Sequence, residues 1–375
     1  MSDKNQNRIH KPHGTSRRMR ILLKSFSITL GAIAVMVVAG ILLWNRTVAP
    51  PPPPPMEAIR LPVTPSVPVE RTTDDQDEDP EEVEYEYVWP APERFTDEDR
   101  RDDFWTFLII GLNEGQNANT VMVASYDGAL KEANLISIPR DVIVHPTRVG
   151  RRLASSYIAG SGGGRGREGG IAQVQRDVMN VIGFVPDFYV VIDYDAFFTI
   201  IDAVGGIYID VPQRMRYVDE YQDLDIDLHP GLQHMDSETA LQFVRFRQGT
   251  RGTNYPGLPR GDFDRVRNQQ IVIEEVVNRL LRPQSLLQIP EFVEIFNDSV
   301  DTNLTIPNMM YFALELNSVR GTDALSSYTL LPSRSSGHPT YEEFLSPQVV
   351  LELVNRTINP FEHALELRDL NVVTQ

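Results

Sequence analysis

Short apolar segments separated by turn-forming residues recur along the chain after residue 103. Three of them are partly β-branched and bounded by Gly, Asn or Pro, which predicts strands at residues 107–111 (FLIIG), 120–125 (TVMVAS) and 133–138 (ANLISI). The pattern then predicts a helix, a strand and a second helix at residues 171–182, 188–193 and 196–203. Because strands and helices alternate, we expect a layered α/β domain.

The C-terminal half continues this alternation. We expect a short helix near residues 236–242, a strand at Arg245-Phe246-Arg247, and a long helix over residues 263–281 that Pro283 ends. Helical stretches at residues 308–316 and 347–354 and a strand at 327–331 complete the prediction. No internal repeat is visible.

A single uncharged apolar run, residues 25–44, has the length of a membrane-spanning helix. The preceding 24 residues hold seven Lys or Arg and one Asp, so the positive-inside rule predicts a cytoplasmic N-terminus and an extracytoplasmic main domain. A cleaved signal peptide is the alternative, but the run is longer than a usual signal core, and Pro50 follows the small-residue site at residues 47–49. We favour a retained anchor in the cell membrane.

A proline run at residues 50–55 and an acidic segment ending near residue 82 separate this anchor from the globular pattern. Such a composition favours a stiff, self-repelling spacer or disordered padding. The predicted organisation is therefore a basic tail (1–24), a transmembrane helix (25–44), a linker (45–102), a main domain (103–283) and a C-terminal extension packed on that domain (284–375).

Charge and cysteine content restrict the partners and the chemistry. The net charge is −17, and the N-terminal tail alone is positive, so the rest of the chain is more acidic still. An acidic domain argues against nucleic acid as a partner. The chain contains no cysteine, which excludes disulfides, thiol catalysis and cysteine metal sites.

Arginines gather in one stretch of this acidic chain. Residues 240–270 contain no lysine but six arginines: Arg245, Arg247, Arg251, Arg260, Arg265 and Arg267. In a strand, Arg245 and Arg247 point to one face and Phe246 to the other, and two guanidiniums on one face suit a diphosphate. The alternative is that Arg is simply the basic residue of this protein, since Lys131 is the only lysine after the apolar run.

Two further segments add candidate ligands for an anion. On the long helix, Arg265 and Gln269 share a face, and we expect Val266, Ile273, Val277 and Leu280 to form a separate apolar stripe. Asp262 lies just before that helix, where a carboxylate is a cap or a base, and Arg265 could simply pair with it at the surface. Arg140 follows the strand at 133–138 and a proline, so it emerges at a sheet edge as a phosphate ligand or a structural partner of Asp141.

For two other patterns a functional interpretation is weaker than a structural one. The segment 160–170 (GSGGGRGREGG) could seat an anion, but it lacks the lysine and hydroxyl of a nucleotide-binding loop, so we expect a flexible loop. Asp227, His229 and His234 could form a metal cluster, but their spacing matches no specific site and exposed loop polarity explains them better.

Several blocks of the chain, in order, resemble the LytR-CpsA-Psr proteins, membrane-anchored transferases that attach glycopolymers to the bacterial cell wall. The blocks are residues 109–111 (IIG), 135–141 (LISIPRD), 189–195 (YVVIDYD), 202–212 (DAVGGIYIDVP), Gly231 with 240–247 (ALQFVRFR), and 261–265 (GDFDR) with Gln269. One block alone would be weak, whereas the ordered set is specific.

The resemblance implies a three-layer α/β/α fold with a central mixed sheet and an apolar tunnel for a polyprenyl chain. It implies that Arg140, Arg245, Arg247 and Arg265 hold the phosphates and that Gln269 donates a hydrogen bond to one oxygen. In the family reaction a peptidoglycan sugar hydroxyl attacks a polyprenyl-pyrophosphate-linked glycan. Catalysis then consists of positioning and charge stabilisation, with Asp262 among the catalytic candidates.

This chain departs from the family pattern at the magnesium ligands. An aspartate after the first strand and an Arg-x-Asp before the second strand are usual, and here the three positions hold Asn113, Asn117 and Asn119. Amide oxygens at Asn113 and Asn119 would bind Mg²⁺ weakly or not at all, since they carry no charge. Asn268 replaces a second helix arginine, and Ala154 replaces an expected asparagine. The sequence thus leaves two hypotheses, a transferase or a non-catalytic polyprenyl-pyrophosphate binding or scaffold protein; a role in gene regulation has no DNA-binding module to support it.

Overall fold

The computed structural model describes residues 50–55, 95–162, 164–220, 224–280, 282, 288–316, 325–337 and 341–374. The predicted cytoplasmic tail, the membrane helix and most of the linker lie outside these residues. Among the helices in the described ranges, none combines the length and apolar character that crossing a bilayer requires.

A six-stranded sheet forms the centre of the domain, in the order β10-β3-β2-β1-β4-β9. β1 pairs with β2 and β2 with β3 in antiparallel fashion, whereas β1 with β4 and β3 with β10 are parallel. The predicted central mixed sheet is therefore confirmed. The strands are β1 (Phe104–Leu112), β2 (Ala118–Asp127), β3 (Glu132–Ser137), β4 (Phe188–Ile192), β9 (Asp301–Thr302) and β10 (Leu325–Thr329).

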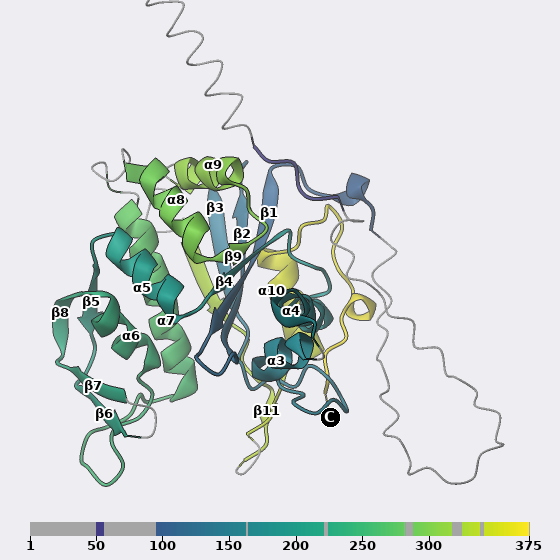
Figure 1. Ribbon diagram of the computed structural model, residues 1–375. Helices are drawn as coiled ribbons and strands as arrows, with labels where there is room; N and C mark the ends of the chain where they lie inside the picture. The colour runs from purple at the N-terminus through teal and green to yellow at the C-terminus, as the bar shows by residue number, and fades with distance from the viewer. Residues whose placement is uncertain are drawn as a thin grey trace, which may run out of the picture. The chain divides into compact units, whose positions relative to one another are not determined.

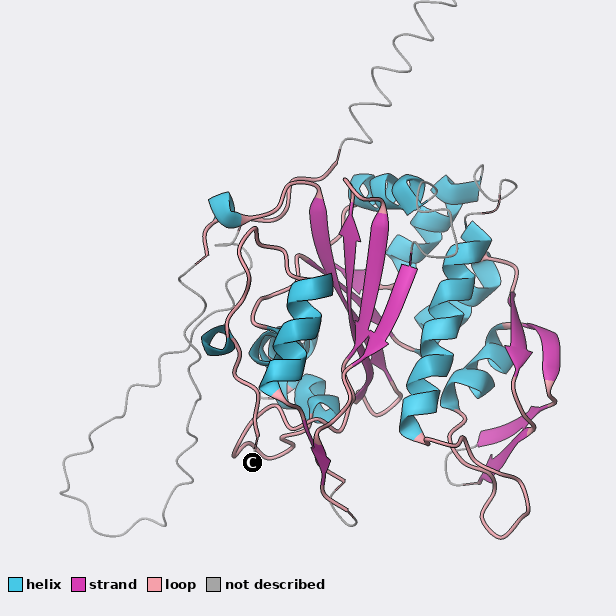
Figure 2. Ribbon diagram, turned by 180° about the vertical axis from the view of Figure 1, so that it is seen from behind, coloured by secondary structure: helices cyan, strands magenta, loops and turns pink. Residues whose placement is uncertain are grey.

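Helices cover both faces of this sheet (Figures 1 and 2). One face carries α3 (Ser156–Ser161), α4 (Gly166–Ile182) and α10 (Pro347–Thr357). The other carries α5 (Tyr194–Ala203), α7 (Asp262–Leu280), α8 (Ile289–Ser299) and α9 (Ile306–Leu316). Successive side chains of β1 point to opposite faces of the sheet, so both faces are apolar and can be covered. Leu108 and Ile110 belong to the core with α4 and α10, whereas the ring of Phe107 contacts Phe312 of α9.

A smaller lobe with two two-stranded antiparallel sheets packs around α6 (Ser237–Arg245) and one side of α7. Its core includes the fully buried Ile207, Phe243 and Phe246. The sheets pair β5 (Ile207–Val211) with β8 (Gly231–Met235) and β6 (Met215–Asp219) with β7 (Leu224–Leu228). The strand and helix pattern above did not predict these four strands. The remaining elements are η1 (Asp97–Asp99), η2 (Leu153–Ser155), η4 (Leu367–Asp369), β11 (Arg334–Ser335) and β12 (Glu343–Phe344).

The predicted Arg-Phe-Arg strand is wrong. Asp236 caps α6, because its carboxylate accepts a hydrogen bond from the N–H of Thr239 at 2.9 Å, and the helix continues to Arg245. Phe246 follows in an extended conformation and is completely buried. The buried ring still separates the two arginines, but by ending a helix rather than by strand alternation.

The prediction of a flexible glycine-rich loop is also wrong for its second half, since α4 begins at Gly166. Helices α3 and α4 approach so closely that a Cβ on Gly160 would lie 2.2 Å from the carbonyl oxygen of Gly169. A Cβ on Gly169 would lie 2.5 Å from the carbonyl oxygen of Gly160. The glycines therefore serve tight backbone packing.

Part of the proline run packs on the domain. The indole N–H of the buried Trp105 donates a hydrogen bond to the carbonyl of Pro51 at 2.9 Å, and Pro51 is itself buried. Around this contact the rings of Tyr126, Tyr311 and Phe312 pack on Trp105. The start of the predicted linker is thus attached to the first residues of β1.

Candidate functional site

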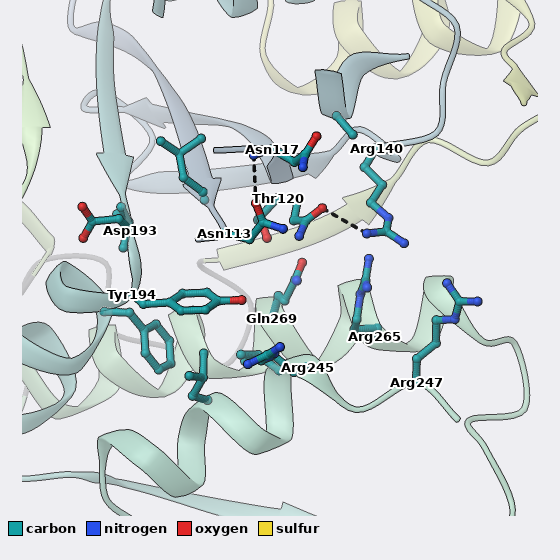
Figure 3. A pocket seen from close by; sticks show the side chains of 18 of the residues that line it. Asn113, Asn117, Thr120, Arg140, Asp193, Tyr194, Arg245, Arg247, Arg265 and Gln269 are labelled. Carbon is teal, nitrogen blue, oxygen red and sulfur yellow. Dashed lines mark hydrogen bonds between the residues drawn. The ribbon is translucent and has the colours of Figure 1, made fainter. Parts of the chain in front are cut away.

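A cavity of about 580 Å³ opens between the carboxyl end of β1, the loop after β3 and the small lobe. Its walls come from β1, β2, α5, α6 and α7, which are far apart in the sequence. Figure 3 shows guanidinium and amide groups meeting across this space. The polar lining consists of Asn113, Asn117, Asn119, Thr120, Arg140, Asp141, Arg152, Ser155, Asp193, Tyr194, Arg245, Arg247, Gln248, Arg265 and Gln269.

All the arginines predicted to bind phosphate line this cavity. Arg140 reaches it from the loop after β3, Arg245 and Arg247 from the end of α6, and Arg265 with Gln269 from α7. The other three arginines of the rich stretch do not line it. Arg260 pairs with Asp264, Arg267 pairs with Glu274, and Arg251 is exposed. The geometry thus separates the six arginines into binding candidates and surface residues.

Asp262 is the carboxylate shared by three of the candidate arginines. It is the first residue of α7, and its oxygens lie 2.7 Å from Arg265, 3.6 Å from Arg140 and 3.7 Å from Arg247. The predicted pair of Asp262 and Arg265 is present, but it is partly buried rather than at the surface, with side chains 22% and 11% exposed. Asp262 therefore holds the arginine cluster together whatever further role it has.

Arg265 is the most constrained cation of the group. Burial, followed by the neighbouring positive charge of Arg140, lowers the pKa of the Arg265 guanidinium to about 10, while Asp262 acts in the opposite direction. A buried guanidinium crowded by like charges is stabilised by any anion that enters the cavity. This electrostatic arrangement favours an anionic ligand.

Several buried polar atoms at this point have no hydrogen-bond partner among the described residues. They are Nε and Nη2 of Arg265, Nε of Arg140, Oε1 of Gln269 and Oδ1 of Asp262. Arg265 Nη2 lies close to Asp262 Oδ1, but the contact is an ion pair whose angles are not those of a hydrogen bond. Buried donors normally find acceptors, so a ligand with several oxygen atoms fits these guanidiniums.

The asparagines at the expected metal positions are engaged with the protein. Asn113 Oδ1 accepts a hydrogen bond from the N–H of Asn117 at 2.8 Å, and Asn119 Oδ1 accepts one from Arg140 Nη1 at 3.0 Å. The described residues hold no group of three or more His, Cys, Asp or Glu side chains placed to bind a metal ion. Asp227 pairs with Arg214, and His234 Nε2 lies 3.0 Å from the carbonyl oxygen of Gly205.

Two lining residues escaped the sequence reasoning. Arg152 lines the cavity and pairs with Asp141 at 3.1 Å. The ring of Tyr194 lies under Arg245, with the guanidinium carbon 5.4 Å from its centroid, and burial raises the pKa of its hydroxyl. Tyr194 belongs to the segment YVVIDYD, so the family resemblance carried a signal for it, whereas no pattern pointed to Arg152.

The other end of the cavity is apolar. Ile273 and Val272 of α7 lie beside Gln269 in its wall. The prediction that Ile273 belongs to a stripe away from Arg265 and Gln269 is therefore wrong, since three successive helical turns place these residues on one face. The apolar lining also includes Ile109, Leu112, Ile192, Phe197, Leu224, Leu241 and Val244. One cavity thus joins a cationic end to a hydrocarbon-lined end.

Comparisons with known proteins agree with this architecture. The regulatory protein MsrR of Staphylococcus aureus is 24% identical over 238 residues, which cover 62% of this chain and 65% of MsrR. The polyisoprenyl-teichoic acid–peptidoglycan teichoic acid transferase TagV of Bacillus subtilis is 27% identical over 216 residues, covering 54% of this chain and 50% of TagV. The chain thus spans only half to two thirds of these relatives.

A solved structure supports the fold. The crystal structure of Bacillus subtilis TagV superposes with a TM-score of 0.55 at 22% identity, covering 69% of this chain and 96% of that one. In sequence, the family model named LytR_cpsA_psr matches residues 68–340, well over half of the chain. The chain belongs to the LytR_cpsA_psr family.

Proposed function

We propose that this chain is a phosphotransferase that attaches a polyprenyl-pyrophosphate-linked glycopolymer to peptidoglycan or another part of the cell envelope. The observation that carries the proposal is the convergence of Arg140, Arg245, Arg247 and Arg265 at one end of a cavity whose other end is apolar. A polyprenyl pyrophosphate has the same two parts, an apolar chain and a compact anion. The transferase activity in the name of the relative TagV supports the same substrate class.

In the proposed complex the polyprenyl chain occupies the apolar end of the cavity beside Ile273 and Phe197. The pyrophosphate contacts Arg265 and Arg140, whose unsatisfied N–H groups face it, with Arg245, Arg247 and Gln269 completing the contacts. The acceptor sugar hydroxyl attacks the phosphorus that carries the glycan. A new phosphorus–oxygen bond forms, and the bond to the polyprenyl phosphate breaks.

The chain's residues contribute mainly charge and position to this reaction. Arginines placed before the substrate arrives stabilise the charge that develops on the phosphoryl oxygens and on the leaving lipid phosphate. Asp262 keeps three of these arginines at fixed distances, and we assign to it the acceptance of the hydroxyl proton. The family's magnesium does not fit the donors present, because Asn113 and Asn119 carry no charge and their oxygens already accept hydrogen bonds.

A non-catalytic lipid-pyrophosphate binding or scaffold protein is the second candidate, and the asparagine substitutions are what favour it. Both candidates require binding, but only the first requires turnover. The test incubates the full chain in detergent with a radiolabelled lipid-linked glycan and peptidoglycan fragments. Release of polyprenyl phosphate with transfer of the glycan supports the transferase, whereas tight binding without release supports the scaffold.

The proposal includes the location of the protein. With residues 25–44 as a retained membrane anchor, the main domain lies outside the cytoplasmic membrane, where lipid-linked glycans and peptidoglycan meet. Fusing reporters that are active on only one side of the membrane to residue 375 tests this topology. A reporter signal from the cytoplasmic side would contradict it.

A further inference from the structure

The amides that replace the usual carboxylates have a role of their own in the cavity. Asn119 accepts a hydrogen bond from Arg140 Nη1, and this bond holds the guanidinium toward Arg265 from the opposite wall (Figure 3). An aspartate at position 119 would form an ion pair with Arg140 and cancel its charge. A neutral amide orients the guanidinium and leaves its charge available to a ligand.

The charge of the lining agrees with this role. Among the described residues, five arginines line the cavity, and only two acids, Asp141 and Asp193, lie in its wall. Asp193 is already engaged as the N-cap of α5, where it accepts a hydrogen bond from the N–H of Ala196. Even with Asp262 included, the positive charges outnumber the negative ones, and a divalent cation would enlarge the excess.

Arg152, which the sequence did not predict as a lining residue, contributes to this excess of positive charge. Its guanidinium lies on the same wall as Arg140, and both arginines contact Asp141, at 3.1 Å and 3.6 Å. One carboxylate thus serves two cations here, and Asp262 serves three, with Arg140 among them again. Nε of Arg140, which has no hydrogen-bond partner among the described residues, lies 3.6 Å from an oxygen of each of these two carboxylates.

We infer that this chain binds a pyrophosphate diester without a divalent metal ion, with Arg140, oriented by Asn119, supplying the positive charge that a metal would otherwise supply. The inference rests on the proposed function for the identity of the anion. It also agrees with the use of both amide oxygens as hydrogen-bond acceptors within the protein. Mg²⁺ binding requires several oxygen ligands around one point, and carboxylates are its usual protein ligands.

The test measures the affinity of the full chain in detergent for farnesyl-pyrophosphoryl-N-acetylglucosamine by calorimetry. One titration contains EDTA and the other contains millimolar MgCl₂. We expect dissociation constants within about twofold of each other, since no metal takes part in the contact. Binding only in the presence of Mg²⁺ would overturn the inference and leave the proposed function standing. No binding in either titration would overturn both.

A second experiment replaces the two amides by carboxylates. The double variant Asn113→Asp, Asn119→Asp should bind the same ligand about tenfold more weakly in EDTA, because the new charges compete for Arg140, and Mg²⁺ should restore the affinity. Asn278→Asp, on an exposed position of α7, is the matched control and should bind like the unaltered chain. Unchanged affinity of the double variant in EDTA would count against the role assigned to Asn119.

A metal readout that does not depend on affinity completes the test. Paramagnetic resonance of Mn²⁺ measures how much metal the protein–ligand complex retains beyond what the free ligand binds. The unaltered chain should retain none, and the double variant should retain about one Mn²⁺ per complex. Stoichiometric Mn²⁺ in the unaltered complex would overturn the inference, whatever the calorimetry gives.

Discussion

Two buried arginines of this protein have opposite environments. Arg100, before the central sheet, has a side chain 4% exposed and pairs with Asp187 at 2.6 Å. The second oxygen of Asp187 accepts hydrogen bonds from the N–H and hydroxyl of Thr106, both at 2.8 Å. Arg265, in the cavity, is 11% exposed and shares its one carboxylate with Arg140 and Arg247.

The difference separates a structural cation from a binding cation. At Arg100 one positive charge meets one negative charge that has its own hydrogen-bond donors, and one guanidinium nitrogen, Nε, has no hydrogen-bond partner among the described residues. At Arg265 three positive charges share one carboxylate, and two guanidinium nitrogens have no such partner in the described part of the chain. Both arginines are largely shielded from solvent, and the ratio of opposite charges is what chiefly distinguishes them.

The largest effect should follow from breaking the structural pair. Asp187→Ala leaves Arg100 buried without a partner, and we expect it to lower the free energy of unfolding by about 3–5 kcal/mol. Denaturant unfolding monitored by circular dichroism measures this loss. The double variant Arg100→Met, Asp187→Leu should recover much of it, because no buried charge remains. A loss below about 1 kcal/mol for the single variant would contradict this view of Arg100.

Removing the Arg265 guanidinium should weaken ligand binding without lowering stability, in contrast to the loss of stability expected for Asp187→Ala. Arg265→Gln should weaken the affinity for a polyprenyl pyrophosphate by roughly 10- to 100-fold, since a charge-assisted contact is lost. Stability should be unchanged or higher, because the substitution relieves repulsion from Arg140. Calorimetric titration and thermal unfolding of the same sample measure both. Arg260→Gln, an exposed arginine paired with Asp264, is the control and should change neither quantity.

A smaller effect on affinity should follow from removing the aromatic ring that packs against Arg245. Tyr194→Leu removes the ring under Arg245 while keeping an apolar side chain at this position. We expect the affinity for polyprenyl pyrophosphate to fall about two- to fivefold, corresponding to a cation–π contribution of about 0.5–1 kcal/mol. Tyr194→Phe keeps the ring and should bind like the unaltered chain, so a loss in both variants would assign the effect to the hydroxyl instead.

Local patterns account for the parts of this fold that the sequence predicted. Apolar runs such as FLIIG and TVMVAS correspond to strands of the central sheet because both faces of that sheet are covered by helices. In contrast, β5 has the alternating pattern of a half-exposed strand, yet its partner β8 lies some twenty residues away and no turn signal links them. Pairing of this kind depends on tertiary packing, which periodicity does not encode.

The candidate site also has a part that the sequence predicted and a part that it did not. Arg140, Arg245, Arg247, Arg265 and Gln269 follow from motif and family resemblance, and the structure brings them into one cavity. The helix expected near residues 236–242 continues to Arg245, where the alternation of Arg-Phe-Arg had favoured a strand. Arg152 was missed because nothing in Arg151-Arg152 indicates which of two adjacent arginines faces the cavity. Its position depends on the loop geometry between β3 and α3.

The last prediction concerns the pH dependence of stability and an acid beside the crowded cluster. Glu343, on β12, lies next to Asp141, whose carbonyl oxygen accepts a hydrogen bond from the Glu343 N–H at 3.0 Å. Burial, then the negative charges of Asp141 and Asp262, raise the pKa of the Glu343 carboxyl from its ordinary value of 4.5 to about 7, and Arg140 offsets only part of this. The folded chain therefore retains a proton that the unfolded chain has lost.

Because the folded state binds this extra proton between about pH 4.5 and pH 7, raising the pH through that window should destabilise the unaltered chain. Glu343→Gln cannot ionise and should lack this contribution. We expect the difference in melting temperature, variant minus unaltered chain, to increase from pH 4.5 to pH 7 and then level off. If the melting temperatures of the two proteins differ by the same amount at every pH, Glu343 is ionised in the folded protein as it is in the unfolded chain. The positive charge of Arg140 would then offset the effects of burial, Asp141 and Asp262 on Glu343 in full.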